Sequence, residues 1–177
     1  MKKFYINIVL ILIGFVIYFL QSNFFSWFTI AGIRPNLFVV YILFIGLFGN
    51  RTIGIAYGAV VGALLDLIFN EKIGENLLAL SIVGIIAMIF DKNFSKDSRV
   101  TIILMVFATT IVYEVVIYFM NYVLYSINVE ILNFIKILLI EVLYNILITI
   151  IIYPLIQKFG YYIENEYKGN KILTRYF

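Results

Sequence analysis

Three acidic side chains, Asp66, Glu114 and Glu141, lie inside long apolar stretches of the sequence. A charged side chain in the core of a bilayer costs several kcal/mol, so each of these residues needs a structural or chemical role. Two neighbouring carboxylates could share a proton and act as general acid and base, as in aspartyl proteases. Only one aspartate lies within an apolar stretch, however, and no Gly-x-Gly-Asp motif occurs. The sequence therefore argues against that chemistry.

Other common catalytic and metal-binding residues are missing from the sequence. The chain contains no cysteine and no histidine, which excludes thiolate nucleophiles, zinc sites of the usual kinds and histidine-based proton transfer. Ser81 has no credible partner base, and there is no phosphate-binding or dinucleotide-binding motif. We therefore expect neither an enzyme nor a protein that holds a cofactor.

The composition predicts an integral membrane protein. Of 177 residues, 64% are hydrophobic and only 13% are charged, whereas soluble domains have about 25% charged residues. The net charge of +3 comes mostly from Lys and Arg residues between the apolar stretches. This pattern is typical of membrane topology rather than of nucleic-acid binding, so soluble enzymes and DNA-binding domains are excluded.

The apolar stretches predict an all-α polytopic membrane protein with six transmembrane helices in a single domain. A helix needs about 20 apolar residues to cross a bilayer. The second span is short, Pro35 suits the first turn of its helix, and the apolar residues 24–33 before it predict an irregular, partly buried segment. The expected spans cover residues 4–20, 35–49, 53–69, 74–90, 100–125 and 132–156, and a cytoplasmic tail covers residues 157–177.

The distribution of Lys and Arg predicts the orientation. With six spans and both termini in the cytoplasm, only Arg34, Lys72 and Lys136 of the 13 basic residues lie outside. This split follows the positive-inside rule and supports the short second span, because its removal would place the basic 91–99 connector outside. The tail from Tyr161 onwards could lie on the inner membrane surface.

Small and polar residues recur every four positions in the third span. Gly54, Gly58 and Gly62 precede Asp66 along one helix face. Overlapping Gly-x-x-x-Gly units let the backbone of another helix approach closely, so we expect a packing seam here. Asp66 either reaches water at the interface or pairs with Arg34, which lies on the same side of the membrane.

The fifth and sixth spans carry polar stripes. Thr110 and Glu114 share one face of the fifth span, and Glu141, Asn145 and Thr149 share one face of the sixth. Both stripes should face the bundle interior or a protein partner rather than lipid. They could act as hydrogen-bonding contacts between helices or form a polar cavity or docking groove in the outer half. A proton or ion pathway is a further alternative.

One part of the sequence carries a family resemblance. Arg34-Pro35-Asn36-Leu37 opens a short span, the three spaced glycines lead to Asp66-Leu67, and Gly74 begins the next span. This pattern, together with the length and the number of spans, resembles the bacterial rod shape-determining protein MreD family.

The resemblance implies a non-enzymatic scaffold of the cell-elongation machinery in the bacterial cytoplasmic membrane. Its partner would be an MreC-like bitopic protein, and the complex would link RodA and a class B penicillin-binding protein, which synthesise peptidoglycan, to the MreB cytoskeleton. We expect an outer-half groove near Arg34, Asp66 and Glu141 to bind this partner.

The resemblance also implies a fold similar to the substrate-capture subunits of energy-coupling factor vitamin transporters. A substrate-binding membrane subunit is therefore the alternative function. In that case Trp27, several tyrosines, Asn121 and Asn145 could line an enclosed pocket of about 300 Å³ or more.

Overall fold

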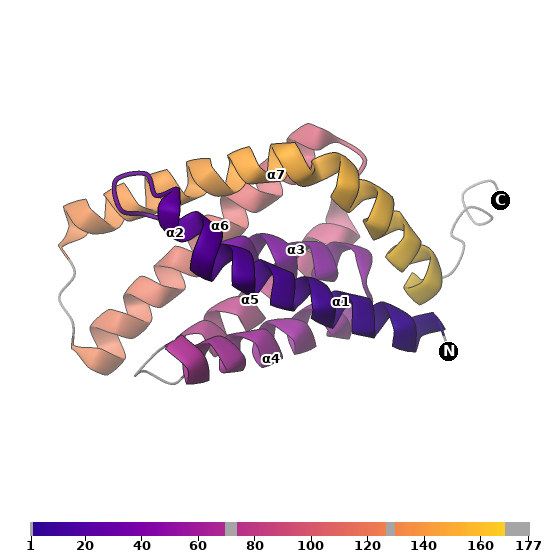
Figure 1. The fold of residues 1–177 in the computed structure, drawn as a ribbon, viewed down its shortest axis with the longest axis horizontal. Coiled ribbons are helices and arrows are strands. Elements are labelled where there is room, and N and C mark those ends of the chain that lie inside the picture. Colours follow the sequence, from indigo (N-terminus) through magenta and orange to yellow (C-terminus); the bar gives the residue numbers. More distant parts are fainter. Residues whose placement is uncertain (1, 70–73, 127–129, 169–177) are drawn as a thin grey trace.

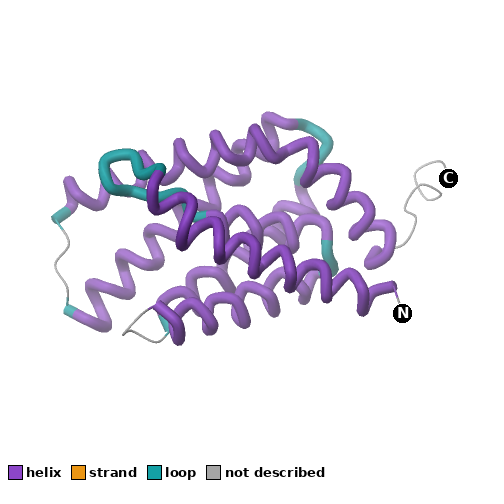
Figure 2. Tube along the Cα trace, in the orientation of Figure 1, coloured by secondary structure: helices purple, strands orange, loops and turns teal. Residues whose placement is uncertain are grey.

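The computed structural model describes residues 2–69, 74–126 and 130–168, and the regular elements in these ranges are helices (Figures 1 and 2). The predicted all-α fold is thus confirmed. The elements are α1 Lys2–Phe19, the short π-helix η1 Leu20–Phe24, α2 Phe25–Trp27, α3 Leu37–Phe48, α4 Arg51–Phe69, α5 Glu75–Asn93, α6 Arg99–Tyr125 and α7 Ile131–Lys168.

Each of the six predicted spans overlaps one of the helices α1, α3, α4, α5, α6 and α7. Within the described residues, three helical stretches are long and apolar enough to cross a membrane, namely Lys2–Trp27, Arg99–Leu124 and Ile131–Lys168. Leu37–Phe48 and Thr52–Ile68 are shorter apolar helices. The chain is therefore an integral membrane protein, while the count of six crossings remains a prediction. Helix α7 continues through Pro154 into the region expected to form the tail.

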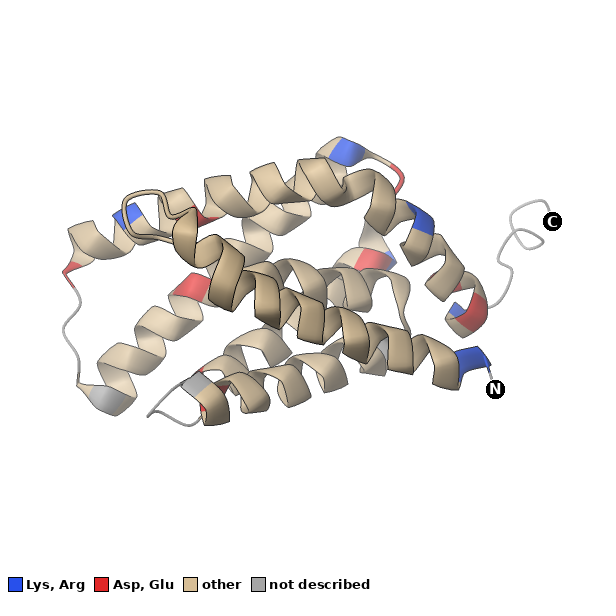
Figure 3. Cartoon of the chain, in the orientation of Figure 1, with Lys and Arg blue, Asp and Glu red and all other residues tan. Residues whose placement is uncertain are grey.

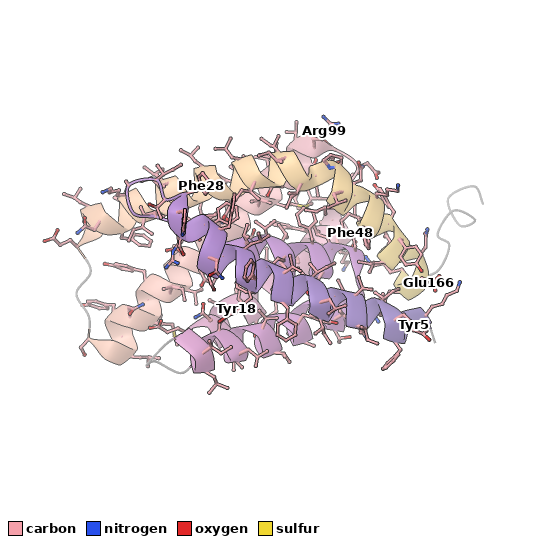
Figure 4. All side chains as sticks on the ribbon, viewed as in Figure 1. Tyr5, Tyr18, Phe28, Phe48, Arg99 and Glu166 are labelled. Atoms are coloured by element: carbon pink, nitrogen blue, oxygen red, sulfur yellow. The ribbon has the colours of Figure 1, made fainter. Side chains whose placement is uncertain are left out.

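Helix α3 lies at the centre of the bundle. All 12 of its residues are buried, and it packs against α1, α4, α5, α6 and α7. Figure 1 shows α1 crossing one side of α3, with α7 along the edge of the bundle. The described chain begins and ends at the same end of the bundle, where Lys2 Nζ lies 3.2 Å from Glu166 Oε1 (Figure 4).

The predicted irregular, partly buried segment at residues 24–33 is only partly confirmed, because the helix continues through η1 and α2 to Trp27 and most of residues 24–33 are exposed. After η1 and α2 the backbone turns back at Ile30–Ile33, where two backbone hydrogen bonds of 3.0 Å close the turn. Asn36 then caps α3, because its side chain accepts a hydrogen bond from Val39 N and its own backbone is not helical. Pro35 therefore lies just before the cap, and the expectation that it occupies the first turn of the helix is wrong.

The glycine stripe of α4 packs against the backbone of α5. A methyl group added to Gly58 would lie 2.3 Å from Leu80 O, and one added to Gly62 would lie 2.3 Å from Asn76 O. These distances are far below van der Waals contact, so the two helices meet backbone to backbone as the Gly-x-x-x-Gly pattern indicates.

This packing predicts that Gly58→Ala will lower the free energy of unfolding by about 1–3 kcal/mol, because the added methyl forces α4 and α5 apart. Gly14→Ala is the matched control, since its methyl would lie 3.6 Å from Tyr41 Oη, an ordinary contact. Denaturant unfolding of both variants in detergent micelles measures the difference. Equal stability of the two variants would contradict the close approach of the helices.

Candidate functional site

The N-terminal end of α3 is capped by side chains from other helices. Twelve residues give a helix about 18 Å long, well below the bilayer core of about 30 Å. Its terminal N–H groups therefore need partners inside the protein. Asn145 Oδ1 accepts from Asn36 N at 2.8 Å, and Gln21 Oε1 accepts from Leu37 N at 3.0 Å. Residues from η1 and α7 thus fix the start of α3.

Asn145 joins the two predicted polar stripes. Its side chain is fully buried, and its Nδ2 donates to Thr110 Oγ1 on α6 at 3.1 Å. Thr149 Oγ1 donates to the backbone carbonyl oxygen of Asn145 at 2.7 Å. The stripes of α6 and α7 therefore face the interior, and at Asn145 they connect α6, α7 and the start of α3.

The C-terminal end of α3 is capped by two lysines. Lys96 Nζ and Lys168 Nζ each donate to Leu47 O at 2.9 Å. Asp91 accepts from both lysines, at 2.8 Å from Lys96 and 2.6 Å from Lys168, and Glu164 accepts from Lys96 at 2.8 Å. Positive charge at a helix C-terminus is also favoured by the helix dipole. We call these four charged residues the lysine cap.

The ion pairs of the lysine cap shift the pKa values of Asp91 and Lys96. Burial raises the pKa of the Asp91 carboxyl, but the hydrogen bonds from Lys168 and Lys96 outweigh burial and hold this pKa below its usual value. For Lys96, burial lowers the pKa, and the hydrogen bonds to Asp91 and Glu164 more than compensate, so the net shift is upward. Both shifts favour the charged forms in the folded protein.

Asp66 caps α5 rather than pairing with Arg34. The carboxylate is fully buried and accepts from the backbone N–H groups of Gly74, Asn76 and Leu77 at 2.9, 2.9 and 3.0 Å. Negative charge is favoured at a helix N-terminus. Asp66 therefore holds the start of α5 against the end of α4, which is a structural role.

Arg34 lies on the segment before α3, and both alternatives for Asp66 are wrong, because it neither pairs with Arg34 nor reaches water. Arg34 Nη1 donates to Ser26 Oγ at 3.1 Å, and its side chain is exposed. The Asp66 oxygens are instead engaged by the start of α5. The guanidinium therefore remains at the surface of the protein.

A polar cleft of about 530 Å³ opens beside Arg34. Glu141 contributes its deepest charge, since this residue is only 7% exposed. Among the described residues, Glu141 Oε1 is buried without a hydrogen-bond partner. Glu114, 9% exposed, interacts with it from α6. The remaining polar residues of the cleft are Gln21, Ser22, Asn36 and Asn76.

A second hollow is an apolar groove of about 520 Å³ between α1 and α7, with α3 as its floor. Its lining is almost entirely hydrocarbon and includes Val9, Val16, Tyr41, Ile152 and Leu155. We call it the α1–α7 groove. The two hollows offer different surfaces, because one presents charge and hydrogen-bonding groups and the other only apolar side chains.

Comparison with protein families identifies the chain. A family model described as rod shape-determining protein MreD matches residues 2–163. The chain belongs to the MreD family. The match covers all six long helices up to the last turns of α7, so the resemblance seen at residues 34–80 extends over most of the chain. No curated protein and no solved structure matches the chain.

MreD membership places the chain among shape-determining membrane proteins, which is not a known enzyme family. Of the expected site residues, the structure brings Arg34, Pro35 and Glu141 to the polar cleft and buries Asn145 behind it. Gln21 and the lysine cap were missed by the sequence analysis. A polar residue directly after the apolar run 4–20 was the available signal for Gln21.

The lysine cap predicts a loss of stability in acid. Because the pKa of Asp91 is lower in the folded protein than in the unfolded chain, its contribution to stability is complete above the unfolded value of about 3.9. That contribution is lost as the pH falls through the folded value. Asp91→Asn is expected to reduce the slope of stability against pH below about pH 4, as measured by denaturant unfolding at several pH values.

Glu130→Gln is the control for this experiment, because Glu130 is exposed and directly precedes α7, which begins at the opposite end of the bundle (Figure 1). Its slope should match that of the unmodified chain. If Asp91→Asn also kept the full slope, the ion pairs of the lysine cap would not be contributing to stability.

Proposed function

We propose that this protein is a non-enzymatic membrane scaffold of the bacterial cell-elongation machinery, and that it binds an MreC-like bitopic protein. Through that partner it would connect RodA and a class B penicillin-binding protein to MreB. Family membership supports the role in rod shape. The structure supports a scaffold because Asp66, Asn145 and the lysine cap are all engaged in capping helix ends.

We propose six crossings of the cytoplasmic membrane with both termini in the cytoplasm. Within the described ranges, most Lys and Arg residues lie near the end of the bundle that carries both described ends of the chain (Figure 3). The lysine cap lies there too. Arg34 instead lies between α2 and α3, at the other end of α1. This asymmetry agrees with the positive-inside rule.

The α1–α7 groove is the proposed docking surface for the transmembrane helix of the bitopic partner. Helices associate within a bilayer mainly through close packing of their side chains, and this groove offers a long apolar surface. Val9, Val16 and Leu155 are 40%, 56% and 64% exposed along its sides. A bitopic protein crosses the membrane with a single helix, and one helix is what such a groove can accommodate. The polar cleft suits such a helix less well, because its lining is charged.

This assignment predicts that Val16→Trp will reduce co-purification of the MreC-like partner from detergent-solubilised membranes at least about fivefold, because the larger ring fills the groove. A bulky residue in a packed interface typically costs about 1–3 kcal/mol. The matched control is Ile11→Trp, since Ile11 is on the same helix and 51% exposed but does not line the groove. Thermal unfolding checks that both variants are folded.

Unchanged co-purification of Val16→Trp would overturn the groove assignment. If Arg34→Ala and Glu141→Leu instead abolished binding in folded protein, the partner would dock at the polar cleft. If no partner co-purified with the unmodified chain, the scaffold function itself would fail.

A further inference from the structure

The polar cleft contains a buried carboxyl group that the fold satisfies only in part, since Glu114 and Asn36 interact with Glu141 but one of its oxygens has no hydrogen-bond partner among the described residues. Glu141 is more than nine-tenths buried and lines the cleft, and its Oε1 has no hydrogen-bond partner in the described part of the chain. A neighbouring ionisable group is another carboxyl, that of Glu114. Buried polar groups are normally paired, and two adjacent acids disfavour each other's ionised forms. A cationic hydrogen-bond donor in the cleft would relieve both costs.

The walls of the cleft are fixed by hydrogen bonds to the backbone and to other helices. Gln21 is held by the N–H of Leu37 at 3.0 Å. Asn76 donates to Asp66 at 2.9 Å and accepts from Tyr113 Oη at 2.6 Å. These bonds tie η1 to α3 and join α4, α5 and α6 around the cleft, so the cleft is formed by rigid elements rather than by loose surface side chains.

Charges of both signs line this one cleft. Arg34 is exposed, and its guanidinium uses one nitrogen to bind Ser26. A guanidinium has five N–H donors, so others are available for an anion. Glu141 provides negative charge deeper inside. A ligand that carries an anionic group next to an ammonium would satisfy both residues.

In the proposed topology the mouth of the cleft lies near the outer membrane surface. Gln21 and Ser22 line it and directly follow the apolar run 4–20, which corresponds to about 25 Å of helix. That length brings the chain close to the edge of the hydrocarbon core, which is about 30 Å thick. Lipid headgroups occupy this level.

We propose that the polar cleft binds a phosphoethanolamine group, with the ammonium donating to Glu141 and the phosphate contacting Arg34. The headgroup of phosphatidylethanolamine is the source that the location favours. A quaternary ammonium, as in phosphatidylcholine, has no N–H and cannot donate to the Glu141 carboxylate. The proposal goes beyond the scaffold function and does not depend on the partner or on the α1–α7 groove.

Native mass spectrometry of the full-length protein, released from micelles containing equal amounts of phosphatidylethanolamine and phosphatidylcholine with identical acyl chains, tests the proposal. We expect one phosphatidylethanolamine to be retained in preference. Glu141→Gln should reduce that preference at least about tenfold, the effect of losing one charge-assisted hydrogen bond. Glu166→Gln is the control, because Glu166 pairs with Lys2 at the other end of the bundle.

Arg34→Gln is the second variant, and it should weaken retention without affecting folding, since Arg34 is exposed. Calorimetric titration with soluble O-phosphoethanolamine distinguishes the source. Binding of this compound without selective lipid retention, again lost in Glu141→Gln, would support the same site with a water-soluble ligand. Equal retention of the two lipids together with no binding of O-phosphoethanolamine would overturn the proposal, as would full retention by folded Glu141→Gln and Arg34→Gln.

Discussion

The structure depends on a central helix that is shorter than the bilayer core is thick. Helix α3 has 12 residues, all of them buried, so both of its ends lie inside the protein. The unpaired N–H and C=O groups at a helix end cannot be left in an apolar environment. Asn145 and Gln21 bind the N-terminal N–H groups, and the lysine cap binds Leu47 O. Residues distant in sequence must therefore meet at α3.

This constraint explains why so apolar a chain retains polar side chains within its helices. Asp66 performs the same task for α5 that Asn145 and Gln21 perform for α3. The glycines of α4 then allow α5 to approach closely enough for the cap to reach. Glu141 differs from these residues, because one of its oxygens is buried without a hydrogen-bond partner in the described structure. It is therefore the buried carboxyl most available to a ligand.

Much of the fold could be predicted from the sequence because it rests on local patterns. The apolar runs located the six main helices, the Arg34–Leu37 sequence indicated the start of the short one among them, and the four-residue spacing placed the glycines at a helix interface. The capping partners could not be predicted in the same way. Lys96 and Asp91 resemble ordinary connector charges, and only the folded chain brings them to Leu47, which lies 49 positions from Lys96. Pairing of Asp66 with Arg34 was one of two alternatives because charge complementarity is visible in a sequence, whereas the packing of the start of α5 against the end of α4 is not.

Hydrogen–deuterium exchange of residues 36–48 in lipid nanodiscs tests the central claim most directly. If side chains from other helices hold both ends of α3, these amides exchange among the slowest in the unmodified protein. In Lys96→Met/Lys168→Met, the loss of the C-terminal cap leaves Leu47 O and two carboxylates without their partners, and exchange across α3 accelerates. Lys2→Met/Lys158→Met, which removes two basic residues outside the lysine cap, leaves exchange unchanged. Equally slow exchange of α3 in both double variants would contradict the account.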